Sequence, residues 1–361
     1  MGDVSVNLRD ISYTINIDSN NLDNAGQLLR QLNYQGKILV VSDENVGKLY
    51  GERIISLLKS AGLMPELFLV QPGEETKSLT VAEKIFAKAI TMGLDRKSPI
   101  IALGGGVVGD LTGFIAATYL RGVPFIQIPT SLLAQVDSSV GGKVAVNHAL
   151  GKNLIGAFYQ PKAVLIDTNT LSTLPERELY TGLAEVIKYG LIADSDFFKY
   201  LKHNSEAILN RDSSALKHII KRSCEIKAEV VEKDEKELSL RVILNFGHTI
   251  AHAIEANTGY KQYNHGEAVA IGMHGAALIS NLLGLCSNEL VEEVRSIISR
   301  YRLPLKAKNC TVDDIINLLL RDKKVVGGKV HWVLLNDIGK VVVRNDVSED
   351  IIKKALVEII I

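Results

Sequence analysis

The hydrophobic pattern of this chain changes its period near Leu174-Pro175, and this change restricts the folds that the chain can adopt. Before it, short runs rich in β-branched residues alternate with amphipathic stretches, which is typical of an α/β domain with a mainly parallel sheet. After it, apolar residues recur at helical spacing. A length of 361 residues also exceeds what one hydrophobic core usually supports. We therefore expect a Rossmann-like α/β domain over residues 1–174 and an all-α domain over residues 175–361.

Individual elements follow from the same periodicity. Strands are expected at residues 37–42, 66–70, 99–103, 124–128 and 163–166. Helices are expected at residues 46–60, 78–91, 215–231, 290–301 and 312–320. Near the C-terminus, residues 329–335 and 340–343 flank the turn sequence Asn336-Asp337-Ile338-Gly339, which predicts a hairpin.

Charge and cysteine content exclude several classes of partner. Lysine plus arginine equals aspartate plus glutamate at 41 each, so no overall basic field favours nucleic acid or an anionic membrane. The longest apolar stretch, residues 268–279, is too short to span a bilayer. Cys224, Cys286 and Cys310 are scattered, which fits a reducing compartment. We expect a cytoplasmic protein without a nucleic-acid or membrane partner.

Histidines gather in the second half of the chain. His248 and His252 are four residues apart, so on a helix they would share one face, and His265 follows in the next segment. Imidazole is the commonest protein ligand for divalent transition metals, and a catalytic zinc site typically uses three protein ligands. Ordinary core or surface histidines are the alternative interpretation.

Glu185 is the candidate third ligand. It stands in a mostly apolar helical run at residues 181–190, with Lys188 one turn further on. A carboxylate in such surroundings is unfavourable unless it is paired or binds a metal. The second half is therefore expected to be a metal-binding domain.

A glycine-rich turn in the first half is typical of phosphate binding. Residues 104–110 follow an expected strand and match the pattern G-x-G-x-x-G, whose glycines let the backbone approach a phosphate at a helix N-terminus. The turn comes later in the chain than the usual dinucleotide fingerprint, so a purely structural tight turn is the alternative. Asp43 could hold a ribose hydroxyl or serve as a helix N-cap. The first half is thus a candidate nucleotide-binding domain.

Basic residues on glycine-flanked segments could bind an anion. Residues 129–143 end in Gly-Gly-Lys, and Lys152 follows Gly151. Lys143 and Lys152 would form a local phosphate clamp, although solvated loop lysines are the alternative. A further polar set, Lys227, Arg241 and Asn245, lies in the second half, and the charged residues 232–237 between its members are interpreted as a solvated loop.

Taken together, these motifs resemble those of the 3-dehydroquinate synthase family. They occur in family order at residues 72–77, 104–110, 129–143, 151–153, 184–190, 245–255 and 265–273. The resemblance implies conversion of 3-deoxy-D-arabino-heptulosonate 7-phosphate, a phosphorylated sugar acid, into 3-dehydroquinate and phosphate. It also implies transient oxidation by NAD, phosphate elimination, reduction and an intramolecular aldol closure, as the second step of the shikimate pathway to chorismate. NAD, one divalent metal ion (zinc or cobalt) and a homodimer are further implications.

The resemblance also assigns the site residues. Glu185, His248 and His265 become the metal ligands, and His252 moves beside the substrate, unlike the pairing that helical spacing favours. NAD would contact Asp43, Glu74, Lys77, Gly105, Gly106, Asp110, Thr130, Ser131 and the turn of Thr170, Leu171, Ser172 and Thr173, with Asp137, Lys143, Lys152 and Asn153 at the border of cofactor and substrate. The substrate would be surrounded by Arg121, Lys143, Lys152, Asn153, Lys188, Lys227, Arg241, Asn245, His252 and Lys324, with Lys323 an equal candidate for the last position.

Two positions depart from the commonest family pattern. Ser131 and Val144 stand where threonine is frequent, and only Val144 removes a hydroxyl. Three alternative functions are open: another sugar-phosphate cyclase, a metal-dependent polyol dehydrogenase that accumulates NADH, and a non-catalytic nucleotide-binding relative. Net NADH formation would identify the second, and failure to bind zinc would identify the third.

Overall fold

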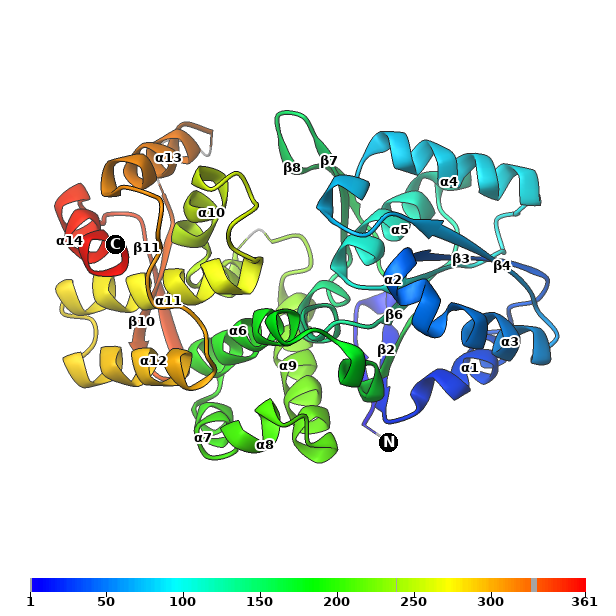
Figure 1. The fold of residues 1–361 in the computed structure, drawn as a ribbon, viewed down its shortest axis with the longest axis horizontal. Helices are drawn as coiled ribbons and strands as arrows, with labels where there is room; N and C mark the ends of the chain where they lie inside the picture. Colours follow the sequence, from blue (N-terminus) through cyan, green and yellow to red (C-terminus); the bar gives the residue numbers. More distant parts are fainter. Residues whose placement is uncertain (1, 238, 326–329) are drawn as a thin grey trace. The chain divides into compact units, whose positions relative to one another are not determined.

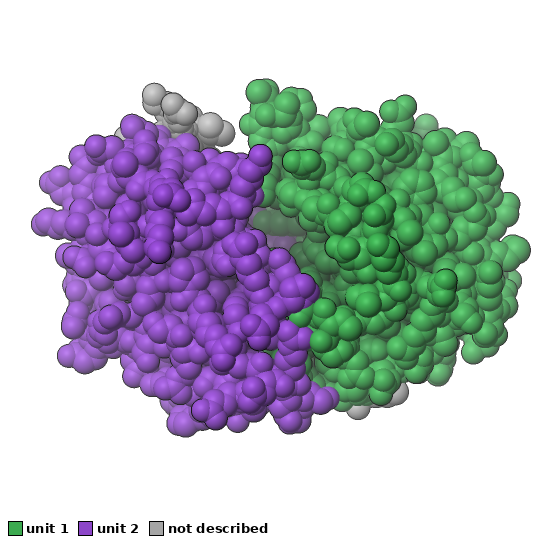
Figure 2. Space-filling view, viewed as in Figure 1, with its two compact units in different colours: residues 1–174, 216–236 green, residues 175–215, 237–361 purple. Residues whose placement is uncertain are grey.

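The computed structural model describes residues 2–237, 239–325 and 330–361, with backbone alone for residues 320–325. The chain divides into two compact units (Figure 2), with unit 1 formed by the chain up to Leu174 and by Leu216–Lys236, and unit 2 by Pro175–Ala215 and Glu237–Ile361. One break between the units falls after Leu174. However, most of helix α9 (Ser213–Lys233) belongs to unit 1, where the Cys224 thiol donates to the backbone oxygen of Gln135 at 3.2 Å. Helical spacing in the sequence does not reveal which core a helix packs on.

Unit 1 is built on a seven-stranded sheet in which only the pairing of β1 with β2 is antiparallel. Its strands in spatial order are β1 (Val4–Val6), β2 (Tyr13–Asp18), β9 (Ala163–Asp167), β6 (Phe125–Pro129), β5 (Ile100–Gly104), β3 (Lys37–Asp43) and β4 (Met64–Val70). The five strands expected from the sequence all form, and β1 and β2 add to them. The expected mainly parallel sheet is confirmed.

Helices cover both faces of this sheet (Figure 1). On β3, Leu39 and Val41 point into one core, which α4 (Leu79–Met92) and α5 (Gly106–Thr118) complete. The intervening Ile38 and Val40 point into the other core, with α1 (Ala25–Gln31) and α3 (Glu52–Ser60). Because strands buried on both faces must be apolar throughout, β3 and β5 show no alternation in the sequence. Unit 1 is therefore a doubly wound, Rossmann-like α/β fold.

The strand order places a topological switch point between β3 and β5. From β3 the chain moves outward to β4 and then returns to the opposite side of β3 to form β5. In open parallel sheets, ligands bind outside the carboxyl ends of the strands at such a point. Asp43 ends β3 and Gly104 ends β5, so both residues flank this position.

A separate hairpin of β7 (Lys143–His148) and β8 (Gly151–Phe158) completes the strands of unit 1 (Figure 1). The sequence pattern did not predict these strands, because both glycine-flanked lysine segments were interpreted as turns. Val144 lies 3% exposed and packs on α5, where a Cβ added at Gly113 would approach its Cγ1 to 2.3 Å. Valine is thus suited to this position, since a threonine there would bury a hydroxyl.

Unit 2 is predominantly helical. Its helices are α6 (Glu176–Ala193), α7 (Ser195–His203), α8 (Ser205–Leu209), α10 (His248–Asn257), α11 (His265–Leu282), α12 (Asn288–Arg300), α13 (Val312–Val325) and α14 (Glu349–Ile359). Strands β10 (Trp332–Asp337) and β11 (Lys340–Arg344) pair as an antiparallel hairpin, so the unit is not strictly all-α. The hairpin was expected near this place, although Lys329 lies outside the described residues.

Helix α11 is the centre of unit 2. It contacts α6, α10, α12, α14 and β10, and it is buried along most of its length (Figure 1). A helix that is apolar all round is expected to be buried in this way, which accounts for the apolar run at residues 268–279. None of the described helices combines the length and hydropathy that crossing a membrane requires.

Candidate metal centre and nucleotide site

Three helices of unit 2 bring together the candidate metal ligands. Glu185 lies in α6, and His248 and His265 are the first residues of α10 and α11. One potential ligand atom from each lies within 4.8 Å of the other two. The Nε2 atoms of His248 and His265 stand 3.6 Å and 3.7 Å from Glu185 Oε1. This donor set is one that zinc and similar divalent ions accept.

The Glu185 carboxylate is suited to hold a cation. It is completely buried, with Oε2 in an ion pair with Lys188 and Oε1 facing the Nε2 atoms of His248 and His265. A buried carboxylate oxygen without a hydrogen bond, as Oε1 is among the described residues, is destabilising. A divalent cation between Glu185 and the two histidines would remove this penalty, so the residues present fit such an ion.

Two glycines of α11 allow the three helices to approach. A Cβ added at Gly266 would lie 2.1 Å from the Thr181 carbonyl oxygen of α6, and one added at Gly272 would lie 2.0 Å from the Gly247 carbonyl oxygen that precedes α10. Both contacts are with backbone, which cannot move aside as a side chain can. The absence of side chains at these positions therefore lets His265 reach Glu185 and His248.

Each histidine also has a contact at its second nitrogen. His265 Nδ1 lies 3.2 Å from Glu255 Oε1, and His248 Nδ1 lies 3.2 Å from the Phe246 carbonyl oxygen. Such contacts fix the ring and leave Nε2 for a metal. Glu255 was not selected from the sequence, yet its position seven residues after His248 puts it on the same helical face and could have revealed it.

Burial keeps His248 in the neutral form that a metal ligand requires. Burial lowers the pKa of His248 well below its usual value, and the positive charges of Lys188, His265 and His252 act in the same direction. His252 itself is exposed, with its ring centroid 5.6 Å from that of His248. Among the described residues, it does not belong to the group around Glu185. The structure therefore gathers His265, rather than the neighbour at helical spacing, with His248.

Hydrogen bonds connect the first turn of α11 to the first turn of α6. Arg177 donates two hydrogen bonds of 2.7 Å to the carboxylate of Glu267, and Asn264 caps α11 through a capping box with the same glutamate. The Asn264 amide also donates to Glu178 Oε1 at 2.9 Å. These bonds hold His265, the first residue of α11, next to α6.

In unit 1, the glycine-rich turn lies at the carboxyl end of β5. Gly105 precedes α5 and provides no side-chain cap, so the first N–H groups of the helix can meet a ligand. A Cβ at Gly105 would lie 3.4 Å from Ser131 Oγ, and one at Gly106 would lie 3.0 Å from Ser138 Oγ. Both glycines thus lie next to serine hydroxyls.

Charged residues near this turn are held in defined positions. Lys77 is 4% exposed and forms an ion pair with Asp110 of α5. Burial raises the pKa of Asp110, while the neighbouring Lys77 opposes this shift. Asp43 accepts hydrogen bonds at Oδ1 from the N–H groups of Asn45 and Val46, at 2.9 and 3.0 Å. Asp43 therefore serves as a helix N-cap, and its ribose role stays a hypothesis.

The remaining residues expected at the cofactor occupy neighbouring loops of unit 1. Thr130 follows β6 and donates from its backbone to the Gly104 carbonyl at 3.0 Å. In the 3-10 turn Thr168–Thr173, Thr170 and Leu171 are buried, Ser172 is exposed, and the Thr173 hydroxyl lies 2.6 Å from that of Tyr50. The buried Thr170 hydroxyl contacts the backbone oxygen of Asp167, so it serves the turn itself.

The polar residues expected at the substrate divide between the units. In unit 1, Lys227 donates to Asp137 Oδ1 at 2.7 Å. Lys143, Lys152 and Asn153 lie on the β7–β8 hairpin, and Arg121 has a left-handed φ of 67° after a second left-handed residue, Leu120. In unit 2, Lys188 and Arg241 are each 2% exposed. The side chains of Lys323 and Lys324 lie outside the described part.

Glu237 is a further residue that sequence reasoning missed. Asn245 donates from Nδ2 to Glu237 Oε1 at 3.2 Å. The charged segment at residues 232–237 was interpreted as a solvated loop, yet Asp234 is only 8% exposed. A run of charges does not by itself show which of its members face the solvent.

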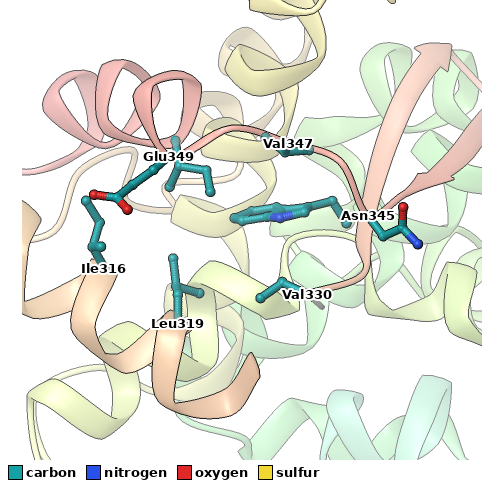
Figure 3. A pocket seen from close by; sticks show the side chains of 8 residues that line it. Ile316, Leu319, Val330, Asn345, Val347 and Glu349 are labelled. Atoms are coloured by element: carbon teal, nitrogen blue, oxygen red, sulfur yellow. The ribbon is translucent and has the colours of Figure 1, made fainter. Parts of the chain in front are cut away.

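A hollow elsewhere in unit 2 is not this site (Figure 3). It is lined by Ile316, Leu319, Val330, Trp332, Asn345, Val347, Glu349 and Ile352. None of the residues named above for metal, cofactor or substrate lines it. Its walls are mostly apolar and lack a convergent set of charged groups, so it has no evident part in the chemistry.

Fold and site define a class of protein that combines two units. One is a doubly wound α/β unit with a glycine turn before α5, and the other is a helical unit in which one glutamate and two histidines could hold a metal ion. The N-terminal and C-terminal profiles of 3-dehydroquinate synthases match residues 67–181 and 182–325. The chain belongs to the 3-dehydroquinate synthase family. It is 49% identical over 359 residues to the 3-dehydroquinate synthase of Thermodesulfovibrio yellowstonii, covering 99% of this chain and 100% of that protein.

Solved structures of related cyclases share the whole fold. The 2-epi-5-epi-valiolone synthase of Streptomyces hygroscopicus subsp. jinggangensis, with NAD+ and Zn2+ bound, has a TM-score of 0.90 at 28% identity, covering 98% of each chain. A 2-deoxy-scyllo-inosose synthase complexed with carbaglucose-6-phosphate, NAD+ and Co2+ has a TM-score of 0.89 at 27% identity, covering 99% of each chain. The chain is thus more similar to curated 3-dehydroquinate synthases than to these two cyclases.

Proposed function

We propose that this chain converts 3-deoxy-D-arabino-heptulosonate 7-phosphate into 3-dehydroquinate and phosphate, using NAD and one zinc or cobalt ion. The observation that carries the proposal is the buried Glu185 carboxylate, which faces two histidine Nε2 atoms in a chain of this family. When bound, the metal polarises substrate hydroxyls and NAD accepts and returns a hydride. The reaction is the second step of the shikimate pathway.

The chain's own residues hold the metal in this proposal. Glu185, His248 and His265 are the ligands, and Glu255 orients the His265 ring through Nδ1. Lys188 neutralises the buried Glu185 carboxylate before the ion binds. Exposed His252 has a ring adjacent to that of His248, and we assign it to proton handling at the substrate.

Residues of unit 1 hold NAD. The N–H groups that follow Gly105 receive the pyrophosphate, because a helix N-terminus favours negative charge. Ser131 and Thr130 flank this position. The remaining contacts are assigned to Asp43, Glu74, Lys77, Gly106, Asp110, Asp137 and the turn of Thr170, Leu171, Ser172 and Thr173.

Cationic residues bind the acidic substrate. Lys143, Lys152 and Arg121 are assigned to its phosphate, since ammonium and guanidinium groups are strong partners for phosphate oxygens. Lys227, Arg241, Asn245 and Lys324 are assigned to its carboxylate and hydroxyls, together with Lys188 and Asn153. The contact between Lys227 and Asp137 holds one of these ammonium groups in position.

A homodimer and a cytoplasmic location complete the proposal. Dimerisation is expected from the family, and sedimentation equilibrium tests it. All three cysteines are free, which supports a reducing compartment.

Phosphate release tests the proposed reaction. The purified protein, given the heptulosonate phosphate and catalytic NAD, is expected to release phosphate without net NADH formation. Treatment with a chelator should stop the release, and added zinc or cobalt should restore it. A seven-carbon sugar phosphate that lacks the carboxylate serves as the matched control substrate.

Each alternative gives a different result in the same assay. Faster turnover of the substrate without the carboxylate would indicate another sugar-phosphate cyclase. Stoichiometric NADH accumulation would indicate a polyol dehydrogenase. Absence of turnover in the zinc-loaded protein would contradict catalysis altogether.

A further inference from the structure

The β7–β8 hairpin needs contacts beyond its own two strands, because an isolated hairpin is at best marginally stable in water. Val144 and Val146 anchor one part of it in the core of unit 1. Its other anchor is Asn147, which donates from its backbone N–H to the Lys77 carbonyl at 2.8 Å and forms an isolated parallel bridge with Ser78. Asn147 is therefore where the hairpin meets the segment that carries Glu74 and Lys77.

The side-chain amide of Asn147 makes one hydrogen bond through its nitrogen and one through its oxygen. Its Nδ2 donates to Glu74 Oε1 at 2.7 Å, and its Oδ1 accepts from the Asn153 backbone N–H at 2.9 Å. A carboxylate only accepts and a backbone N–H only donates, so this network permits one orientation of the amide. Aspartate, which has the same shape, offers only acceptors when it is ionised.

The bond to Asn153 supports a constrained backbone. Asn153 has a φ of 58°, a left-handed conformation that few residues other than glycine and asparagine adopt readily. It directly follows Lys152, whose Nζ lies 4.0 Å from the same Glu74 oxygen that Asn147 contacts. Glu74 and Asn147 thus contact Lys152 and Asn153, two residues near the start of β8.

We propose that Asn147 is a positioning residue that couples NAD binding at Glu74 to phosphate binding at Lys152 and Asn153. This inference rests on the proposed function, which assigns Glu74 to the cofactor and Lys152 to the substrate phosphate. A cofactor that holds Glu74 in place also holds Asn147, and through it the backbone of Asn153. By linkage, a bound phosphate strengthens NAD binding by the same factor.

Calorimetric titration of the zinc-loaded protein measures this coupling. NAD is titrated without inorganic phosphate and then with saturating inorganic phosphate. We expect phosphate to tighten NAD binding of the wild type by about tenfold, within the usual range of site–site coupling. Equal NAD affinity under both conditions would overturn the proposal.

Three variants separate coupling from simple structural support. Asn147→Ala should weaken NAD binding most in the presence of phosphate and bring the coupling factor close to one. Asn147→Asp keeps the acceptor for Asn153 but places a second carboxylate beside Glu74, so it should lose the coupling as well. In the double variant Glu74→Gln, Asn147→Asp, the new amide at position 74 can donate to the new carboxylate at position 147. The hydrogen bond between the two positions is then restored in the opposite direction, so part of the coupling should be recovered.

The matched control is Asn24→Ala, which removes another amide hydrogen bond of unit 1, from Asn24 Nδ2 to Asn21 Oδ1 at 2.9 Å. It should keep the wild-type coupling factor. A purely structural role for Asn147 would instead weaken NAD binding equally with and without phosphate, which would overturn the proposal. If Asn147→Ala does not fold, the Asp variant and the reversed pair decide the question.

The assay of phosphate release distinguishes failure of the proposed role of Asn147 from failure of the proposed reaction. Turnover of the heptulosonate phosphate without coupling contradicts the role of Asn147 alone. Coupling without turnover contradicts the proposed reaction but supports the link through Asn147.

Discussion

Units 1 and 2 build their sites in different ways. In unit 1, the candidate nucleotide residues follow the ends of parallel strands, so Asp43, Gly105 and Thr130 are near one another because the strands are. In unit 2, Glu185, His248 and His265 come from three helices and meet only because those helices pack closely. The end of a strand can be predicted from the sequence, whereas the place where two helices pack against each other cannot.

This difference also affects how each site tolerates change. The unit 1 site depends on backbone N–H groups and on glycines that border serine hydroxyls. The unit 2 site depends on buried side chains, on a carboxylate oxygen that lacks a hydrogen bond among the described residues, and on glycines in contact with backbone oxygens. We therefore expect substitutions in the helical site to have the larger consequences, and the following predictions test this in order of decreasing effect.

His265→Ala should have the largest effect, because it removes one of three ligands. Zinc affinity is expected to fall by more than the roughly 10- to 100-fold typical for loss of a residue that merely supports a ligand. Metal content after dialysis against a chelator measures this, with His203→Ala of α7 as the exposed control. Stoichiometric zinc in the His265 variant would contradict the ligand assignment.

Glu255→Gln should weaken zinc binding by about 10- to 100-fold, since the His265 ring loses its charged partner at Nδ1. NAD affinity, which depends on unit 1, should stay unchanged. Competition with a chromogenic chelator measures the metal affinity, and Glu292→Gln, an exposed position of α12, is the control. Wild-type zinc affinity in the Glu255 variant would show that the contact has no orienting role.

Gly272→Ala should destabilise unit 2 by about 1–3 kcal/mol, as overpacking typically does. The added methyl group would meet the Gly247 backbone oxygen. Trp332, the one tryptophan of the chain, is buried in unit 2, so its fluorescence follows denaturant unfolding of that unit.

Gly47→Ala in unit 1 is the matched control for this substitution. Its methyl group would meet the end of the Leu69 side chain, which is 45% exposed and free to move aside. Little change in stability is therefore expected, and unfolding followed by circular dichroism measures it. Equal losses for the two alanine variants would contradict the argument from backbone contact.

The smallest effect concerns pH. Burial lowers the pKa of His274 in α11 below its usual value of 6.5. Below about pH 6.5 the unfolded chain binds a proton that the native histidine does not, so unit 2 should lose stability as the pH falls and reach a plateau above this value. Trp332 fluorescence in denaturant measures the trend in the metal-free protein, and a His274→Gln variant should show a flatter one.

Much of unit 1 could be predicted from the sequence. All five expected strands form, and the glycine turn lies at the end of β5 as expected. The first two strands and the β7–β8 hairpin were missed. The hairpin is a two-stranded ribbon whose second strand is mostly exposed, so its residues resemble a loop in composition. Asn147 escaped notice for the same reason.

Unit 2 was predicted less completely. Its helices at residues 290–301 and 312–320 appear as α12 and α13, but spacing alone favoured His252 as the partner of His248. Helical periodicity describes neighbours within one helix. The family resemblance, rather than the pattern, indicated His265.

The sequence by itself determined the local structure: the alternation of strands and helices, the positions of the glycines and the types of side chain that could bind a metal. Only the tertiary structure decided which of those side chains meet. It brought Glu255 to His265, assigned Leu216–Lys236 to unit 1 and joined Asn147 to Glu74. The physical reason is that distances between residues remote in sequence depend on how closely whole elements pack, and that closeness is set by contacts such as those at Gly266 and Gly272.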